Sequence, residues 1–164
     1  MRILSILFCL AFAAPAFAQG TTVPFGGLKQ DPSLPVEINA AELSVDQTDN
    51  SAIFSGGVTV TQGEVKLTAD TIRVVYAPAV EGQPAKVSQL EAGGGVTLNS
   101  GEAVATAEKA IYDINTGNVV MTGGISLLQG PTSVTGDRMT VNLTSGTGQI
   151  EGNVRTILTP TQKP

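Results

Sequence analysis

Three acidic residues recur at equivalent places along the chain and are its best candidates for chemistry. Asp70, Glu108 and Asp137 each lie seven residues after a glycine of a repeated segment. Carboxylates that stack above one another can act as acid and base on a glycosidic bond. The chain has no histidine, the side chain best suited to proton transfer near neutral pH and a common metal ligand. The pattern leaves a glycan-acting protein open and predicts no metal site and no cofactor.

A structural interpretation of the same three carboxylates is the one we favour. Each follows an Ala or Gly at an expected strand corner, where a carboxylate commonly accepts backbone N–H bonds. Lys109 and Arg138 directly follow two of them, and such solvated charge pairs contribute little free energy. We therefore predict that the chain is not an enzyme.

The elements that would hold these residues are three repeats that align without gaps, at residues 54–76, 92–114 and 121–143. In each repeat a glycine precedes a β-branched residue, and a second glycine follows six residues later. A fourth copy starts at Asn153 and stops early, and a partial leading copy aligns Glu42 with Asp70. This arrangement predicts stacked units with atypical units at the two ends.

Apolar residues alternate with polar ones inside each repeat, as in Val58, Thr59 and Val60. Period-two alternation predicts strands with one apolar and one wet face. We expect about three short strands per unit and an all-β domain without helices. Stacking would align the apolar faces into a continuous trough with two open ends.

Charge and composition limit what the trough could bind. The chain has 164 residues, with 9 Lys and Arg against 14 Asp and Glu, so its formal net charge is −5. This excess of negative charge excludes nucleic acid as a partner. Aromatic residues make up only 4% of the chain, so the wall would present methyl groups rather than stacking platforms. Such walls suit aliphatic chains.

The first eighteen residues have the composition of an export signal. Arg2 precedes an apolar run at residues 3–12, and Ala16 and Ala18 form a small-x-small cleavage pattern. Cys9 lies inside the apolar run, which disfavours a lipoprotein anchor. We predict a cleaved signal at 1–18, a flexible leader at 19–34, the β domain at 35–158 and a tail at 159–164. The protein would then be exported to the periplasm.

Several motifs resemble the OstA-like family. They are PVEINAAELSVDQ from Pro35, AIFSGGVTVTQG from Ala52, LTAD from Leu67 and VVMTGG from Val119. Their order and spacing extend over residues 35–158. The resemblance implies a twisted, open β-jellyroll of stacked units that shields the lipid A acyl chains of lipopolysaccharide. It also implies that the protein passes lipopolysaccharide from the inner to the outer membrane.

The resemblance implies partners at both ends of the stack. An inner-membrane-anchored OstA-like protein would join the N-terminal edge, and an outer-membrane barrel protein the C-terminal edge. Copies of the chain could also join head to tail, because open stacks leave unpaired strand edges. The candidate edge residues are Val36, Ile38, Val154 and Ile157.

The predicted trough lining consists of apolar residues that share the inward parity. It comprises Val58, Val60, Leu67, Ile72, Val74, Val96, Leu98, Tyr112, Ile125, Leu127, Met139, Val141 and Leu143. Two alternatives stay open: a periplasmic β-solenoid scaffold whose apolar rows form a packed core, and a glycan-acting protein without lipid cargo.

Overall fold

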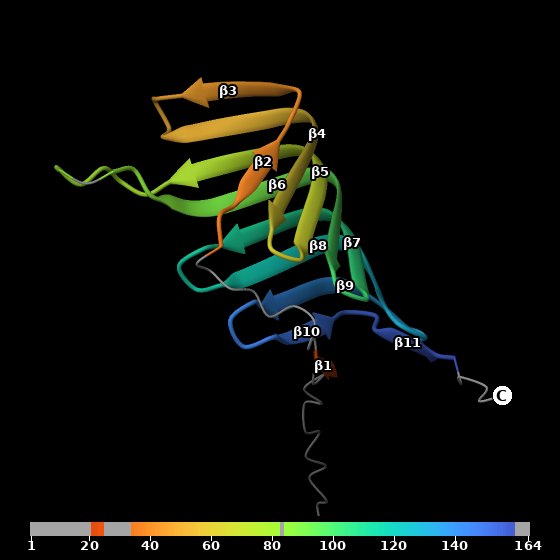
Figure 1. The fold of residues 1–164 in the computed structure, drawn as a ribbon. Helices are drawn as coiled ribbons and strands as arrows, with labels where there is room; N and C mark the ends of the chain where they lie inside the picture. The colour runs from red at the N-terminus through yellow and green to blue at the C-terminus, as the bar shows by residue number, and fades with distance from the viewer. Residues whose placement is uncertain (1–20, 25–33, 83, 160–164) are drawn as a thin grey trace, which may run out of the picture.

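The structure is a computed structural model that describes residues 21–24, 34–82 and 84–159, and it is built from one antiparallel sheet (Figure 1). No helix occurs in these residues, which confirms the predicted all-β fold. The strands are β1 (Thr21–Pro24), β2 (Glu37–Asn39), β3 (Glu42–Asp46), β4 (Ser51–Gln62), β5 (Val65–Tyr76), β6 (Val87–Ser100), β7 (Ala103–Asp113), β8 (Asn118–Gln129), β9 (Thr132–Asn142), β10 (Thr147–Glu151) and β11 (Arg155–Leu158).

Each repeat forms two long strands rather than the three short ones that we expected. The hairpins β4–β5, β6–β7 and β8–β9 follow one another in the sheet. A register shift lies in the middle of each long strand pair, as between Ser55 and Val58. Gly56 and Gly57, which lie in that shift, have φ near +80°, a backbone conformation that glycine adopts without steric cost. The glycine pair therefore bends the strand without ending it.

The acidic residue of each repeat packs against a glycine of the next strand. A Cβ atom built on Gly94 would lie only 2.6 Å from the Cβ of Asp70, and one on Gly123 only 2.6 Å from that of Glu108. At the start of the sheet, Ala41 occupies this place against Gly56. Our alignment of Glu42 with Asp70 was therefore wrong by one residue, because Ala41 is the structural equivalent.

The bends at the glycine pairs fold the sheet along a crease into two arms (Figure 1). We call one of them the turn arm. It consists of residues 58–69, 96–107 and 125–135, which include the three hairpin turns. The loop arm contains residues 51–55, 71–93, 109–122 and 138–142. The apolar side chains of both arms form one core cluster between them.

Register keeps the inward side chains in line across the loop arm. One row of neighbouring backbone partners runs from β3 to β10: Leu43, Phe54, Ile72, Ala92, Ala110, Met121, Met139 and Ile150. A second row is Val45, Ala52, Val74, Leu90, Tyr112, Val119, Val141 and Gly148. The predicted alignment of apolar rows across the stack is present in the structure.

Two short strands lie side by side at each end of the sheet. At the N-terminal end β2 and β3 both pair with β4, and at the C-terminal end β10 and β11 both pair with β9. Strand β1 pairs with the outer edge of β10. It falls inside residues 19–34, where we expected no regular structure. Its first three residues, Thr21, Thr22 and Val23, are β-branched and favour strands once an edge is available.

The predicted signal at 1–18 lies outside the described residues, as do residues 160–164 of the predicted tail. Within the described ranges, the search for a helix long and apolar enough to cross a membrane found none.

Candidate functional site

An apolar cavity of about 380 Å³ lies between the two arms. Among the residues that the structure describes, Gln62 and Tyr112 are the only lining residues with a polar side chain. The described lining consists of Leu34, Val36, Ile38, Val60, Gln62, Val65, Leu67, Ile72, Val74, Val87, Leu90, Ala92, Leu98, Ala110, Tyr112, Ile114, Val119 and Leu143. The volume lies in the range of small-molecule sites in proteins. The cavity therefore has room for an apolar ligand without a rearrangement of the sheet.

The mouth of the cavity is marked by apolar side chains that reach solvent. Leu34, Val36 and Ile114 are each more than one third exposed, although all three line the cavity. The Gln62 Nε2 donates a hydrogen bond of 2.9 Å to the backbone oxygen of Leu34. This bond holds the segment before β2 against the β4–β5 turn, so that it forms part of the cavity wall.

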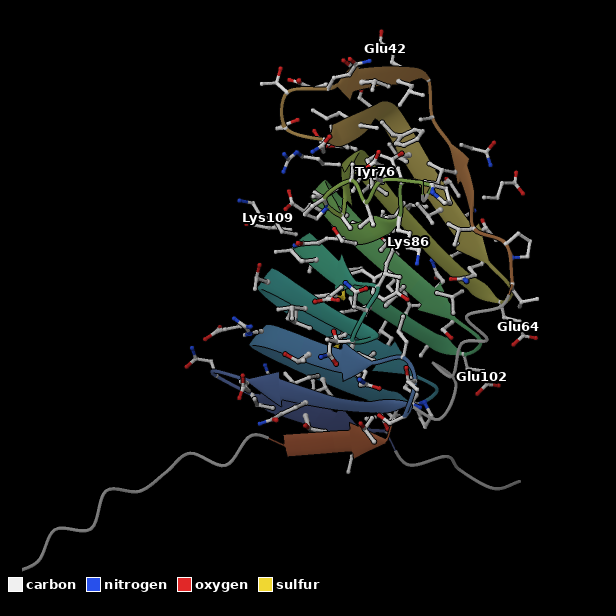
Figure 2. All side chains as sticks on the ribbon, turned by 90° about the vertical axis from the view of Figure 1, so that its left-hand side faces the viewer. Glu42, Glu64, Tyr76, Lys86, Glu102 and Lys109 are labelled. Atoms are coloured by element: carbon white, nitrogen blue, oxygen red, sulfur yellow. The ribbon has the colours of Figure 1, made fainter. Side chains whose placement is uncertain are left out.

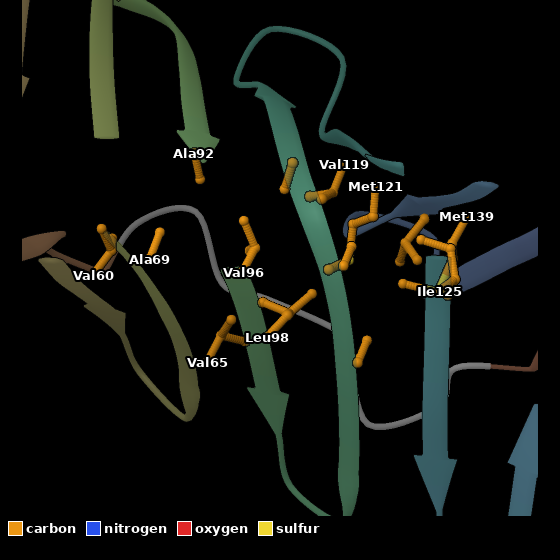
Figure 3. Packing of buried hydrophobic residues seen from close by; sticks show 14 of the residues in the cluster. Val60, Val65, Ala69, Ala92, Val96, Leu98, Val119, Met121, Ile125 and Met139 are labelled. Atoms are coloured by element: carbon orange, nitrogen blue, oxygen red, sulfur yellow. The ribbon is translucent and has the colours of Figure 1, made fainter. Parts of the chain in front are cut away.

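Seven of the thirteen predicted lining residues reach this cavity: Val60, Leu67, Ile72, Val74, Leu98, Tyr112 and Leu143. The structure places the other six in the closed part of the core, where each is at most 2% exposed: Val58, Val96, Ile125, Leu127, Met139 and Val141. Figure 3 shows Met121, Ile125 and Met139 packed together there. The apolar rows thus extend along the stack, but the hollow space lies toward its N-terminal end.

Sequence reasoning missed several lining residues for different reasons. Leu90, Ala92 and Val119 share the inward parity of the predicted rows, so periodicity could have found them. Leu34 has no comparable signal, because it reaches the cavity from the predicted leader. Val36 and Ile38 were predicted as edge residues, and the structure also gives them a place in the wall.

Burial raises the pKa of Tyr112 above its usual value of about 10, and the charge of Asp113 raises it further. The Tyr112 hydroxyl therefore stays neutral under ordinary conditions. A neutral phenol suits an apolar wall, because an ionised group would lose its hydration there.

The raised pKa of Tyr112 has a consequence for stability at high pH. The unfolded chain ionises this tyrosine first, so its stabilising contribution is complete below about pH 10 and is lost as the pH rises through the folded pKa. We expect the free energy of unfolding to fall less steeply above pH 10 in Tyr112→Phe than in the wild type. Denaturant titrations at several pH values measure this. If the free energy of unfolding fell equally steeply with pH in both proteins, burial of the Tyr112 hydroxyl would be contradicted.

The three recurring carboxylates lie outside the cavity. Asp70, Glu108 and Asp137 are exposed at the crease, and none of them lines the hollow. They come from β5, β7 and β9, which are two strand spacings apart, about 10 Å. The Asn153 Nδ2 donates a 2.8 Å hydrogen bond to Asp137 Oδ2, which agrees with a structural role.

Other charged side chains also face away from the interior. Figure 2 shows Lys109 on one margin of the sheet and Glu64 and Glu102 on the opposite margin. On the outer face, Arg73 bonds to Asp49 at 2.7 Å and to Glu91 at 3.3 Å. The hydrogen bond from Ser51 and then the bond from Arg73 lower the pKa of Asp49. Within the described ranges, no charged residue lines the cavity.

The fold and the cavity define a class of protein: an open, all-β jellyroll with an apolar hollow between two arms. Residues 37–147 match the family model described as "LptA/(LptD N-terminal domain) LPS transport protein". The chain therefore belongs to the LptA/LptD N-terminal domain family of LPS transport proteins, and the resemblance to the OstA-like family is confirmed.

Individual relatives agree with this assignment. The chain is 31% identical over 114 residues to an uncharacterised protein of Rhizobium meliloti (strain 1021), covering 68% of this chain and 61% of that protein. It is 32% identical over 83 residues to the LPS-assembly protein LptD of Escherichia coli (strain K12), covering 51% of this chain and 10% of LptD. The chain thus spans less than two thirds of the length of these curated relatives.

A solved structure has the same fold. It is LptH from Pseudomonas aeruginosa, described as the LptA homologous periplasmic component of the conserved lipopolysaccharide transport device. The TM-score is 0.67 at 16% sequence identity, over 80% of this chain and 99% of LptH. The similarity shows that the two proteins share the jellyroll.

Proposed function

We propose that this protein is a periplasmic bridge that shields lipid A acyl chains in its interior and passes lipopolysaccharide from the inner to the outer membrane. The observation that carries the proposal is the hollow apolar cavity between the arms, in a chain of an LPS transport family. The described residues of the cavity wall are almost entirely aliphatic, and none of them is charged. Such a surface can exchange apolar contacts with successive parts of an acyl chain.

The energetic need for such a surface follows from the cargo. Exposure of hydrocarbon to water costs about 0.8 kcal/mol per methylene, so one acyl chain of about ten methylenes costs about 8 kcal/mol. Lipopolysaccharide carries several such chains, which makes free diffusion through water negligible. An apolar wall removes most of this cost without a covalent step. The protein would act as a passive guide, with energy supplied by other components.

The hollow favours a lipid carrier over a scaffold with a packed core. Well-packed domains leave few voids larger than a water molecule. Here Leu67, Leu90 and Leu98 border a space of about 380 Å³, while Met121 and Met139 close the other half of the core. A protein that served only as a scaffold would be more stable if side chains filled the hollow half of the core as well.

The strands at the two ends of the sheet support the proposal that this protein joins other jellyrolls. Ile38 lies in β2 at the N-terminal end, and Ile157 lies in β11 at the C-terminal end. Val36 and Val154 directly precede these strands. Edge strands can add a strand of another protein by backbone pairing. The N-terminal edge would receive an inner-membrane-anchored OstA-like protein, and the C-terminal edge an outer-membrane barrel protein or a second copy.

Extraction of bound lipid tests the cargo. The exported protein is purified from the periplasm, its bound lipid is extracted, and the fatty acids are identified by mass spectrometry. We expect the hydroxylated acyl chains of lipid A in an amount comparable to the protein. A fully delipidated protein that fails to bind added lipopolysaccharide would support the scaffold alternative instead.

A further inference from the structure

The C-terminal edge of the sheet is already occupied in the monomer. Strand β1 pairs antiparallel with β10 over four residues, from Thr21 opposite Ile150 to Pro24 opposite Thr147. Figure 1 shows β1 beneath β10, at the end of the sheet opposite β3. Among the described strands, the neighbouring β11 pairs with β9 alone, so none of them covers its outer edge. Only half of the C-terminal end is thus available to a docking jellyroll.

Strand β3 of a second copy fits the place that β1 occupies. Strand direction alternates through the whole sheet, so β1 and β3 run in the same direction and both would be antiparallel to β10. A copy stacked head to tail in the same orientation would therefore present β3 to β10 in the correct sense. The same stacking would place its β2 antiparallel to β11.

The two apolar side chains of β3 are largely exposed. Leu43 is 58% exposed and Val45 is 65% exposed, although they continue the two inward rows of the loop arm. On β10 those rows reach Ile150 and Gly148, whose backbone partners on β1 are Thr21 and Val23. If β3 of the next copy paired with β10, Leu43 and Val45 would extend both rows across the joint and lose exposed apolar surface.

The pairing of β1 with β10 is short. It joins four residues of each strand, whereas β8 and β9 pair through ten residues each. An edge strand held by so few backbone partners is suited to be displaced.

We propose that β1 is a removable cap on β10 that competes with β3 of a second copy of this chain. The proposal rests on the head-to-tail joint of the proposed function. With β1 bound, the protein is a capped monomer; with β1 released, β3 of the next copy pairs with β10 and the apolar rows continue between subunits. Release of the N-terminal strand would thus control the growth of the bridge.

A reversible disulfide tests the cap. Thr22 and Gln149 are backbone partners, and paired positions in antiparallel strands lie within disulfide range. Removal of the predicted signal, which contains Cys9, leaves no other cysteine. In Thr22→Cys/Gln149→Cys we expect the oxidised protein to stay monomeric in sedimentation velocity and the reduced protein to associate as the wild type does. Thr22→Cys alone is the matched control.

A second variant releases β1 permanently. Thr22→Pro/Val23→Pro removes two backbone donors from β1 and should tighten self-association about tenfold if β1 covers β10 nine tenths of the time. Adding Leu43→Asp to this variant should abolish the gain, because β3 would bring a charge to the joint.

The outcomes separate the cap from the joint. Equal association of oxidised and reduced protein, or failure of the disulfide to form, would overturn the cap. Absence of association in every form, the proline variant included, would overturn the head-to-tail joint as well, while the lipid extraction would still decide the cargo.

Discussion

Leu67→Glu is expected to weaken lipopolysaccharide binding at least a hundredfold. Leu67 lines the cavity on the turn arm and is only partly buried, so the free protein can hydrate a carboxylate at this position. An acyl chain in the cavity would exclude that water and leave the charge without a partner, which costs several kcal/mol. Each 1.4 kcal/mol corresponds to a factor of ten in affinity. Titration of the delipidated protein with lipopolysaccharide measures the loss.

Thr68→Glu is the matched control for this variant. Thr68 is the next residue of β5, so it points to the outer face while it carries the same added charge. We expect its affinity to stay within about twofold of the wild type. Comparable losses in both variants would show that net charge, rather than the cavity, governs binding.

Gly94→Ala is expected to destabilise the fold by about 2 to 5 kcal/mol. Gly94 has φ of +82°, and an added Cβ would lie 2.6 Å from the Cβ of Asp70. The left-handed backbone costs an L-residue about 1 to 2 kcal/mol, and overpacking adds about 1 to 3 kcal/mol. Because this contact forms the crease, its loss would also alter the angle between the arms. Denaturant unfolding of the two proteins gives the difference.

Gly95→Ala separates backbone strain from overpacking. Gly95 has the same φ of +82°, but a Cβ atom there would meet no atom within 4 Å. We expect it to cost only the backbone part, about 1 to 2 kcal/mol. Removal of the opposing side chain in Gly94→Ala/Asp70→Gly should return part of the stability. If the double variant lost more stability than the two single variants together, the contact between positions 94 and 70 would be contradicted.

The sequence pattern was sufficient for the fold because the repeats carry local information. The alternation of Val58, Thr59 and Val60 indicates an inward and an outward face whatever the strand pairs with. The alternation of residue types does not predict the number of strands per unit. A glycine pair at φ near +80° bends a strand, but the same residues could equally end one, and only pairing with the next strand decides.

The limits of the cavity could not be predicted from parity. Val60 and Leu127 share the inward face of the turn arm, yet Val60 borders the hollow and Leu127 is packed in the closed half. The difference comes from volume and from the distance between the arms, which the alternation of residue types does not encode. The role of Leu34 depends on a hydrogen bond from Gln62, 28 residues away along the chain.

Site-specific photocrosslinking to lipopolysaccharide is the most direct measurement of lipid shielding inside the protein. A photoreactive amino acid is placed at Val60 in the cavity, at neighbouring Thr59 on the outer face, or at Leu127 in the closed core. We predict lipopolysaccharide adducts from position 60 and few or none from position 59, with position 127 reacting only if the closed half opens during transport. Equal adducts from positions 59 and 60 would contradict the account.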